Sequence, residues 1–309
     1  MPAPVVAEIV RSGFVEGHHY GSVVALAADG SVDWSVGDVR SPILPRSCNK
    51  PLQAVAMLEA GLRLDGELLA LASASHSGED FHLDGVRRIL AGAELDEGAL
   101  QTPADYPLDD QAREELLRSG GTRSSIAMNC SGKHAAMLAT CVANGWDTST
   151  YLAADHPLQV AIGHTFAELT GEPVEVVATD GCGAPLLSAS LTGLARAFQR
   201  LVEAEPGTPE RRVADEMRAH PELVAGTGVD DTVLMGAVPG LLAKGGAEGV
   251  VAVAVPGVGA VALKIADGAM RPRTPVLLSA LEKLGVPAPH LKELILGGGE
   301  PVGEVRSVW

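Results

Sequence analysis

Hydrophobic residues follow a strand-like pattern at the two ends of the chain. Runs rich in β-branched residues or in valine and alanine stand near both ends, and each predicts a strand. Asp29-Gly30 separates two of these runs and residues 256–259 separate another two, so each pair is expected to form a hairpin. The predicted strands are 5–10, 20–27, 31–36, 249–255 and 260–265, with a short extended segment at 174–178.

The middle of the chain has the spacing of amphipathic helices. From 49 to about 92 the apolar residues recur at helical intervals, interrupted by a small polar loop at 73–78. Residues 100–107 lack periodicity and are expected to form a loop. Further helices are predicted at 111–118, 135–143, 157–170, 187–204, 209–218, 231–243 and 275–284.

This order of elements predicts a mixed α/β (α+β) fold. We expect one antiparallel sheet from both chain ends, about 1–40 and 244–309, flanked by helices, with a helical middle region at 49–243. No internal repeat, low-complexity linker or charge run marks a boundary. The chain is therefore expected to form a single domain, 1–309.

Charge and cysteine content narrow the class of protein. The formal net charge of −16 disfavours nucleic acid or an anionic membrane as a partner. No apolar run is long enough for a membrane span, and the first residues lack the pattern of a secretory signal, so we expect a cytoplasmic protein. In that setting the four cysteines, Cys48, Cys130, Cys141 and Cys182, are expected to be reduced thiols or metal ligands.

Ser47 and Lys50 stand where the first strands give way to the first helix. If a helical turn begins at Ser47, a spacing of three places the hydroxyl and the amine on one face. Pro51 agrees with this start, because proline is tolerated in an opening turn. A neutral lysine can take the proton of a serine, and the helix N-terminus and Arg46 both favour the neutral amine.

The Ser-x-x-Lys pattern is short, and in most chains it has no catalytic meaning. Here the chain contains only six lysines against seventeen arginines, so lysine is not its general-purpose cation. Arginine cannot act as a base, whereas lysine can. The composition therefore favours a chemical role for Lys50.

Two further segments carry candidate polar groups. Ser75, with His76, could relay a proton or bind substrate, or the loop could be a plain connection whose serines cap the next helix. Lys244 precedes two glycines, which would let a backbone edge approach a ligand, although a cation before a glycine is also typical of a helix end. Lys264 is a weaker rival, because the apolar residues around it alternate as around an outward charge.

Cys130 and Cys182 stand in separate loops, each near a glycine. Two thiolates could meet there and bind zinc, with a third ligand from Lys133, His134 or Asp180. Lysine is an uncommon ligand because it must be bound neutral. The alternative is a pair of small buried thiols without a metal.

Taken together, these motifs resemble those of one family. They lie in order along most of the chain, from about Val10 to Lys264, and resemble the class 3 L-asparaginases of rhizobial type. The motifs are residues 46–51, 74–80, 129–134, 155–157 and 179–182, followed by Lys244 before a glycine-rich strand.

The resemblance implies a fold similar to serine β-lactamases and glutaminases, with hydrolysis of L-asparagine to L-aspartate and ammonia. It also implies a homodimer. Its two catalytic pairs would be Ser47 with Lys50 and Ser75 with Lys244. The remaining implied residues are Cys130, Lys133 and Cys182 for zinc, and Arg46 and Asp180 for substrate.

Two other functions remain open at this point. The same Ser/Lys core could serve a glutaminase or another small amidase or peptidase. A noncatalytic protein that binds zinc or a small molecule could retain the same pocket. Turnover of L-asparagine would separate the L-asparaginase from both of these alternatives.

Overall fold

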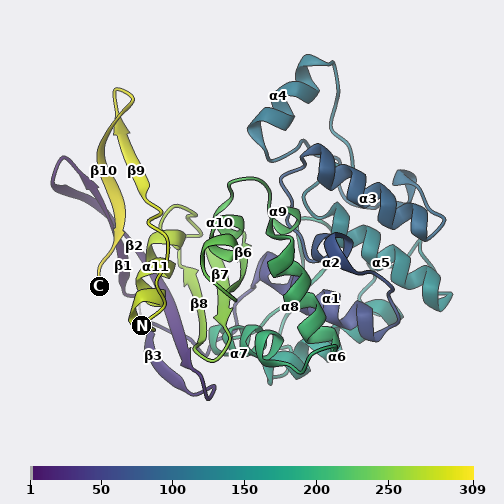
Figure 1. Cartoon of the computed structure of the whole chain (residues 1–309), viewed down its shortest axis with the longest axis horizontal. Helices are drawn as coiled ribbons and strands as arrows, with labels where there is room; N and C mark the ends of the chain where they lie inside the picture. Colours follow the sequence, from purple (N-terminus) through teal and green to yellow (C-terminus); the bar gives the residue numbers. More distant parts are fainter. Residues whose placement is uncertain (1–2) are drawn as a thin grey trace.

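The strands come from both ends of the chain and form one antiparallel sheet. The computed structural model describes residues 3–309. Within them the sheet has the order β6-β7-β8-β2-β1-β10-β9, with β3 paired to β2 (Figure 1). Its strands are β1 (Val5–Arg11), β2 (Phe14–Ala27), β3 (Val32–Val36), β6 (Leu242–Gly246), β7 (Val250–Val255), β8 (Gly259–Ile265), β9 (Glu293–Gly297) and β10 (Glu300–Ser307). A separate two-stranded sheet joins β4 (Val177–Thr179) to β5 (Pro185–Leu187).

The segment between β3 and β6 is mainly helical, as the spacing predicts. Figure 1 shows most of these helices gathered beside the sheet. These helices are η1 (Arg46–Asn49), α1 (Lys50–Glu59), α2 (Gly66–Ala72), α3 (Asp80–Gly92), η2 (Glu97–Ala99), α4 (Asp110–Arg118), α5 (Ser131–Asn144), α6 (Pro157–Thr170), α7 (Leu191–Glu203), α8 (Pro209–Ala219), α9 (Pro221–Val224) and α10 (Asp230–Ala237). A further helix, α11 (Arg273–Lys283), follows β8. The predicted mixed α/β fold, with a sheet from both chain ends, is confirmed.

Burial explains why β7 is a continuous apolar run, and it extends to the edge strand β6. Every residue of β6 and β7 is buried, because helices cover this part of the sheet. Helix α7 packs against β2, β7 and β8, and α11 packs against β8 and β10. Helix α1 packs in turn against α5, α6 and α8, so the helical layer shares one core with the sheet.

The predicted hairpin at Asp29-Gly30 is present between β2 and β3. Gly30 has a φ of 80°, a conformation that glycine adopts without steric cost. The Asp29 carboxylate accepts the N–H of Ser31 at 2.9 Å. The turn chemistry therefore fixes the register of these two strands.

Three expectations about the elements differ from the structure. The helix predicted at 187–204 begins only at Leu191, because 185–187 form β5 and the Ser190 side chain caps the helix. The helix predicted at 231–243 ends at Ala237, because Pro239 and Gly240 interrupt it and the chain then enters β6. Strands β9 and β10 carry little β-branched alternation, so the sequence pattern predicts no strand in either segment.

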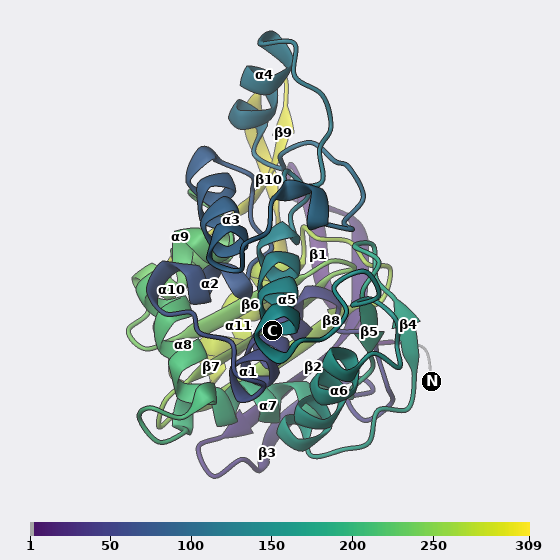
Figure 2. The ribbon, with the colours of Figure 1, turned by 90° about the vertical axis from the view of Figure 1, so that its right-hand side faces the viewer.

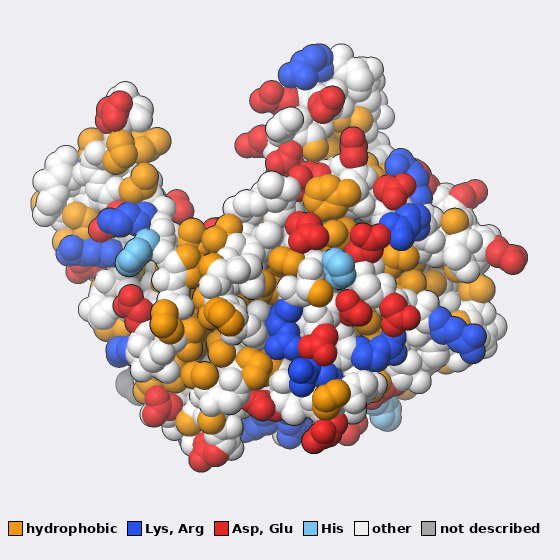
Figure 3. Space-filling view, viewed as in Figure 1, with side chains coloured by type: hydrophobic (Ala, Val, Ile, Leu, Met, Phe, Trp, Pro, Cys, Tyr) orange, Lys and Arg blue, Asp and Glu red, His pale blue; other side chains and the backbone are white. Residues whose placement is uncertain are grey.

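The molecule has two projections with a hollow face between them. Figure 2 shows α4 and the tips of β9 and β10 extending beyond the rest of the chain. In the space-filling view the same projections flank a hollow in which apolar side chains gather (Figure 3). Among the described residues, no helix combines the length and apolar character that crossing a membrane requires.

Candidate functional site

Three of the six lysines are fully buried, and they are the three that the motifs single out. Lys50, Lys133 and Lys244 are 1%, 2% and 1% exposed. The other three lysines are half-buried or exposed. Burying an ammonium group costs several kcal/mol unless partners compensate it. Three buried amines in one chain therefore indicate a built polar site inside the protein.

The local backbone presents Ser47 at the start of the helical layer. Ser47 lies on the 3-10 turn η1, Lys50 begins α1, and Pro51 occupies the opening turn as expected. Arg46 has a φ of 54°, which costs a non-glycine residue about 1–2 kcal/mol. Such strain is commonly found where a chain aims a functional side chain. Ser47 is half-buried, so a small molecule can reach it.

Strand β6 approaches this turn closely because Gly246 lacks a side chain. A Cβ atom on Gly246 would lie 2.6 Å from the carbonyl oxygen of Pro45 and 3.3 Å from the nitrogen of Ser47. On the other side of the turn, Cys48 donates its thiol hydrogen to the carbonyl of Lys244 at 3.0 Å. The sheet edge and the serine turn are therefore packed against each other.

The Lys50 amine reaches the polar loop after α2. It donates to Ser75 Oγ at 2.8 Å and to the carbonyl of Ala74 at 2.6 Å. The loop is held on both sides, because the N–H of Ser75 bonds to Val224 and that of His76 bonds to Asn129. Ser75 is thus a fixed partner of Lys50.

The structure brings the predicted groups together but joins them differently from the predicted pairs. Within residues 3–309, no hydrogen bond joins Ser47 Oγ to the Lys50 amine, and none joins Ser75 Oγ to the Lys244 amine. Lys244 instead donates to the carbonyl of Gly245 at 2.8 Å and lies 3.7 Å from Asp231 Oδ2. The pairing of serines with lysines in catalysis remains a prediction.

Burial sets the charge balance around Lys244. Removal from water lowers the pKa of Lys244 to about 8, the Asp231 carboxylate acts in the opposite direction, and the Lys50 charge adds to the lowering. The amine therefore changes charge close to neutral pH.

Cys130, Lys133 and Cys182 also meet. Cys130 precedes α5, and Cys182 lies in the turn between β4 and β5, so only the first of them opens a helix. Gly132 allows α5 to pack closely against α2, because a Cβ on it would lie 2.5 Å from the carbonyl oxygen of Leu71. The Lys133 amine then donates to Cys182 Sγ at 3.2 Å.

The thiol pair favours one negative charge. A hydrogen bond from Cys182 lowers the pKa of Cys130 well below its ordinary value, and the charges of Lys50 and Lys133 support the same direction. No group of three or more His, Cys, Asp or Glu suited to a metal occurs in the described chain. A metal at this place would therefore need lysine as a ligand.

The sequence offers His134 only as an optional ligand, and the structure places it beside the thiols. Its Nδ1 lies 2.7 Å from Tyr151 Oη, and its buried Nε2 has no hydrogen-bond partner among residues 3–309. Burial lowers the pKa of His134 to about 4, so the ring is neutral near pH 7. A neutral ring thus borders the Cys182 thiol.

Arg46 and Asp180 connect the serine turn to the thiol loop. Arg46 Nε donates to Asp180 Oδ1 at 2.8 Å, and the pair is largely buried. Burial opposes ionisation of Asp180, but the bond from Arg46, the backbone N–H of Gly181 and the Lys133 charge together outweigh it, so the pKa of Asp180 lies below its ordinary value. The Cys182 thiol lies 3.7 Å from the other oxygen of Asp180.

Two charged residues beside the site have no sequence signal strong enough to single them out. Asp231 lies in the first turn of α10, and Arg273 lies at the start of α11. The Asp231 carboxylate is next to both Lys244 of β6 and the Arg273 guanidinium. An acidic residue in a first turn and a lone arginine are common in any chain. Only their burial marks them as unusual.

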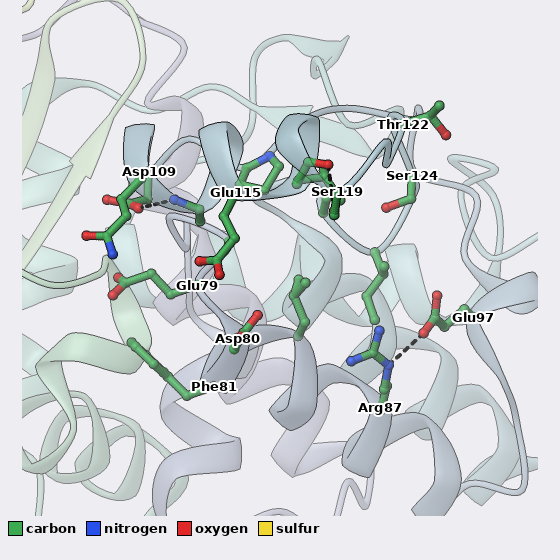
Figure 4. Close-up of a pocket in the computed structure, with 18 of the residues that line it drawn as sticks. Glu79, Asp80, Phe81, Arg87, Glu97, Asp109, Glu115, Ser119, Thr122 and Ser124 are labelled. Carbon is green, nitrogen blue, oxygen red and sulfur yellow. Dashed lines mark hydrogen bonds and ion pairs between the residues drawn. The ribbon is translucent and has the colours of Figure 1, made fainter.

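A separate hollow of about 870 Å³ lies between α3 and α4 and contains none of the predicted site residues. Figure 4 shows acidic side chains around it, including Glu79, Asp109 and Glu115, with Arg87 bonded to Glu97 at one end. Glu79 also accepts hydrogen bonds from Ser77 and Thr227, which follow the Ser75 loop and α9. The hollow therefore borders the Ser75 loop without opening onto Ser75.

Comparison with solved structures gives weak likenesses to hydrolases. A beta-lactamase from Mycobacterium bovis is 15% identical with a TM-score of 0.45, over 85% of this chain and 94% of that one. A beta-lactamase described as putative, from Bacteroides dorei, is 16% identical with a TM-score of 0.46, over 85% and 92%. The protein named Mglu is 14% identical with a TM-score of 0.47, over 85% and 63%. Likenesses of this strength do not assign a function.

Comparison with curated proteins gives no significant match. The family model described as L-asparaginase II, in contrast, matches residues 7–307. This match covers nearly the whole chain, including every residue of the predicted site. The chain belongs to the L-asparaginase II family.

Proposed function

We propose that this protein is an L-asparaginase, which hydrolyses L-asparagine to L-aspartate and ammonia. The observation that carries the proposal is the buried Lys50 amine. Lys50 follows Ser47 by one helical turn, and its amine donates a hydrogen bond to Ser75. A buried amine with a hydroxyl partner is the arrangement that activates a serine for acyl transfer. The family match supports amide hydrolysis as the reaction class.

In the proposed mechanism Lys50, as the neutral amine, takes the proton of Ser47. Ser47 Oγ attacks the side-chain amide carbon, the C–N bond breaks, and the protonated nitrogen leaves as ammonia. Water then hydrolyses the resulting ester and regenerates the serine. Ser75 Oγ, which is bonded to Lys50, relays protons between this amine and the leaving group, with Lys244 as its predicted second partner.

Arg46 and Asp180 would position the substrate. L-Asparagine carries an α-ammonium and an α-carboxylate, so it offers one charge to each member of this ion pair. A small zwitterion has few atoms to bind by, and each charge that finds a partner adds to its orientation. The half-buried pair beside Ser47 provides both signs at one place.

We also propose that the thiol cluster binds zinc. Cys130, Lys133 and Cys182 would hold the ion, with the neutral His134 ring adjacent to Cys182. Two thiolates and an amine suit zinc and leave one position open. When bound, the ion would supply positive charge next to the substrate carboxylate.

Replacing Cys130 or Cys182 by serine is expected to reduce bound zinc from about one ion per chain to nearly none. The fold should persist, because both thiols form a small satellite cluster outside the main core. Metal analysis of the purified variants measures this. Cys141→Ser is the matched control, because that thiol is buried in the main core. Equal zinc content in all four proteins would refute the site.

The substrate is tested directly by ammonia release from L-asparagine, with Ser47→Ala protein as the background. Glutamine and a β-lactam, assayed in parallel, represent the other small-amidase and peptidase functions. We expect asparagine to be hydrolysed most efficiently. A higher kcat/KM for another amide would assign the site to that substrate, whereas tight binding of asparagine without turnover would indicate a noncatalytic protein.

The family resemblance also supports a homodimer of the 31.8 kDa chain. Light scattering on the purified protein measures the mass in solution. We expect twice the chain mass, and a mass equal to one chain at micromolar concentration would contradict the dimer.

A further inference from the structure

The buried carboxylate of Asp231 lies next to β6, the edge strand that carries Lys244. Asp231 is 3% exposed, and its Oδ2 accepts the N–H of Gly245 at 2.6 Å. The same oxygen lies 3.7 Å from the Lys244 amine. Because Lys244 also donates to the carbonyl of Gly245, both backbone groups of that glycine are bonded to these two side chains.

The guanidinium of Arg273 lies next to the Asp231 carboxylate, as a second charged neighbour beside Lys244. The side chain of Arg273 is 11% exposed, and its Nη2 lies 4.0 Å from Asp231 Oδ1. That oxygen is buried and has no hydrogen-bond partner within residues 3–309, so its interaction with Arg273 is electrostatic. A Cβ on Gly245 would lie 2.3 Å from Arg273 Nη1, so a side chain at this position would displace the guanidinium.

From this arrangement we propose that Asp231, backed by Arg273, is a positioning residue that holds the Lys244 amine against the serine turn and sets its charge. The proposal rests on the proposed function, in which Lys244 is the second amine of the site. Neither residue contacts the reacting atoms, so both act through Lys244.

The charges that face Lys244 come from four elements. Cys48 on η1, Lys50 on α1, Asp231 on α10 and Arg273 on α11 all act on its amine. Burial raises the pKa of Cys48 to about 12, so that thiol is uncharged near neutrality. Asp231 is then the one anion among these four, and Lys50 and Arg273 oppose it.

The two neighbours have opposite expected effects on Lys244. An opposite charge at about 4–6 Å shifts a pKa by about 1–3 units, so Asp231→Asn is expected to lower the pKa of Lys244 by about one unit or more. The amide oxygen of the introduced asparagine would still accept the Gly245 N–H. Arg273→Gln removes a repelling cation and should raise the same pKa, by about half a unit, because Arg273 acts on Lys244 more weakly than Asp231 does.

A proton relay through Lys244 needs the neutral amine, so activity rises with pH through the pKa of this group. The experiment measures kcat for asparagine hydrolysis against pH in the wild type, Asp231→Asn and Arg273→Gln. We expect the midpoint of the rise to move to lower pH in the first variant and to higher pH in the second. Asp215→Asn is the matched control, because Asp215 is 49% exposed and pairs with Arg211 and Arg218 rather than with Lys244 or Arg273.

A purely structural role for Asp231 predicts another result. It would lower thermal stability or kcat in both variants while leaving the midpoint where it is, or it would move both midpoints in one direction. Either outcome overturns the proposal. Thermal unfolding of each variant shows whether the protein is folded under the assay conditions.

A second measurement does not depend on catalysis. Lysine ¹³Cε chemical shifts, with the Lys244 signal identified by its loss in Lys244→Met, give the pKa of the amine in each protein. Opposite shifts in Asp231→Asn and Arg273→Gln would uphold the positioning role even if asparagine were not a substrate. Unchanged titration of Lys244 would refute this role, whatever the enzyme assay shows.

Discussion

Replacing Lys50 by methionine is expected to lower kcat for amide hydrolysis by about 10³-fold, within the range that loss of a general base produces. Methionine fills similar space and suits the buried position, but it cannot accept a proton or bond to Ser75. The Lys50→Met protein should therefore keep its fold but lose the proton transfer that Lys50 provides. Steady-state ammonia release at several asparagine concentrations separates kcat from KM.

Lys264→Met is the control for this first prediction. Lys264 lies in β8, donates to the carbonyls of Glu248 and Ile265, and is the lysine that the sequence offers only as a weaker rival to Lys244. Its loss should change kcat by only a few-fold. If Lys264→Met lost activity and Lys50→Met retained it, the assignment of the base would be wrong.

Replacing Ser47 by alanine is expected to lower turnover by about 10³-fold or more, because the nucleophile itself is removed. Ser75→Ala should also be slow, since it removes the hydroxyl that bonds to Lys50. The two variants are expected to differ in whether a covalent acyl-enzyme forms during turnover. Acid quenching during turnover, followed by intact-mass measurement, detects an aspartyl ester on the protein.

We expect this ester in Ser75→Ala protein and none in Ser47→Ala protein. The reverse pattern would make Ser75 the nucleophile, with Lys50 as its directly bonded base. The geometry gives this alternative a physical basis, because the 2.8 Å bond joins Lys50 to Ser75. The strained turn at Arg46 favours Ser47, whereas both serines are half-buried.

Features encoded over short distances could be predicted from the sequence. The helix at Pro157–Thr170 has the predicted bounds, because a proline at its start and a glycine after its end mark both termini. The turn at Ser47 and Lys50 is local for the same reason, since η1 and the first residues of α1 determine it.

The candidate residues can also be identified without their geometry. Lysine is scarce in this chain, and the motif lysines Lys50, Lys133 and Lys244 are the ones that the fold buries. A scarce residue type in a polar motif is therefore informative even without coordinates. The family resemblance, which the match over residues 7–307 confirms, rests on the same local motifs.

Contacts between distant segments could not be predicted in this way. Lys50 and Ser75 are bonded because α1 and the loop after α2 pack together, and no spacing rule joins residues 25 positions apart. Strands β9 and β10 form because β1 offers a free edge for β10, although their own residues signal β structure weakly.

The sequence by itself therefore determined most of the helices, the strands before and after them up to β8, and the chemical groups of the site, since periodicity, turn residues and motifs are local properties. Tertiary structure alone decided which hydroxyl meets which amine, and it placed Asp231 and Arg273 behind Lys244. The physical reason is burial. Electrostatic interactions between groups far apart in the chain become strong only when folding removes them together from water.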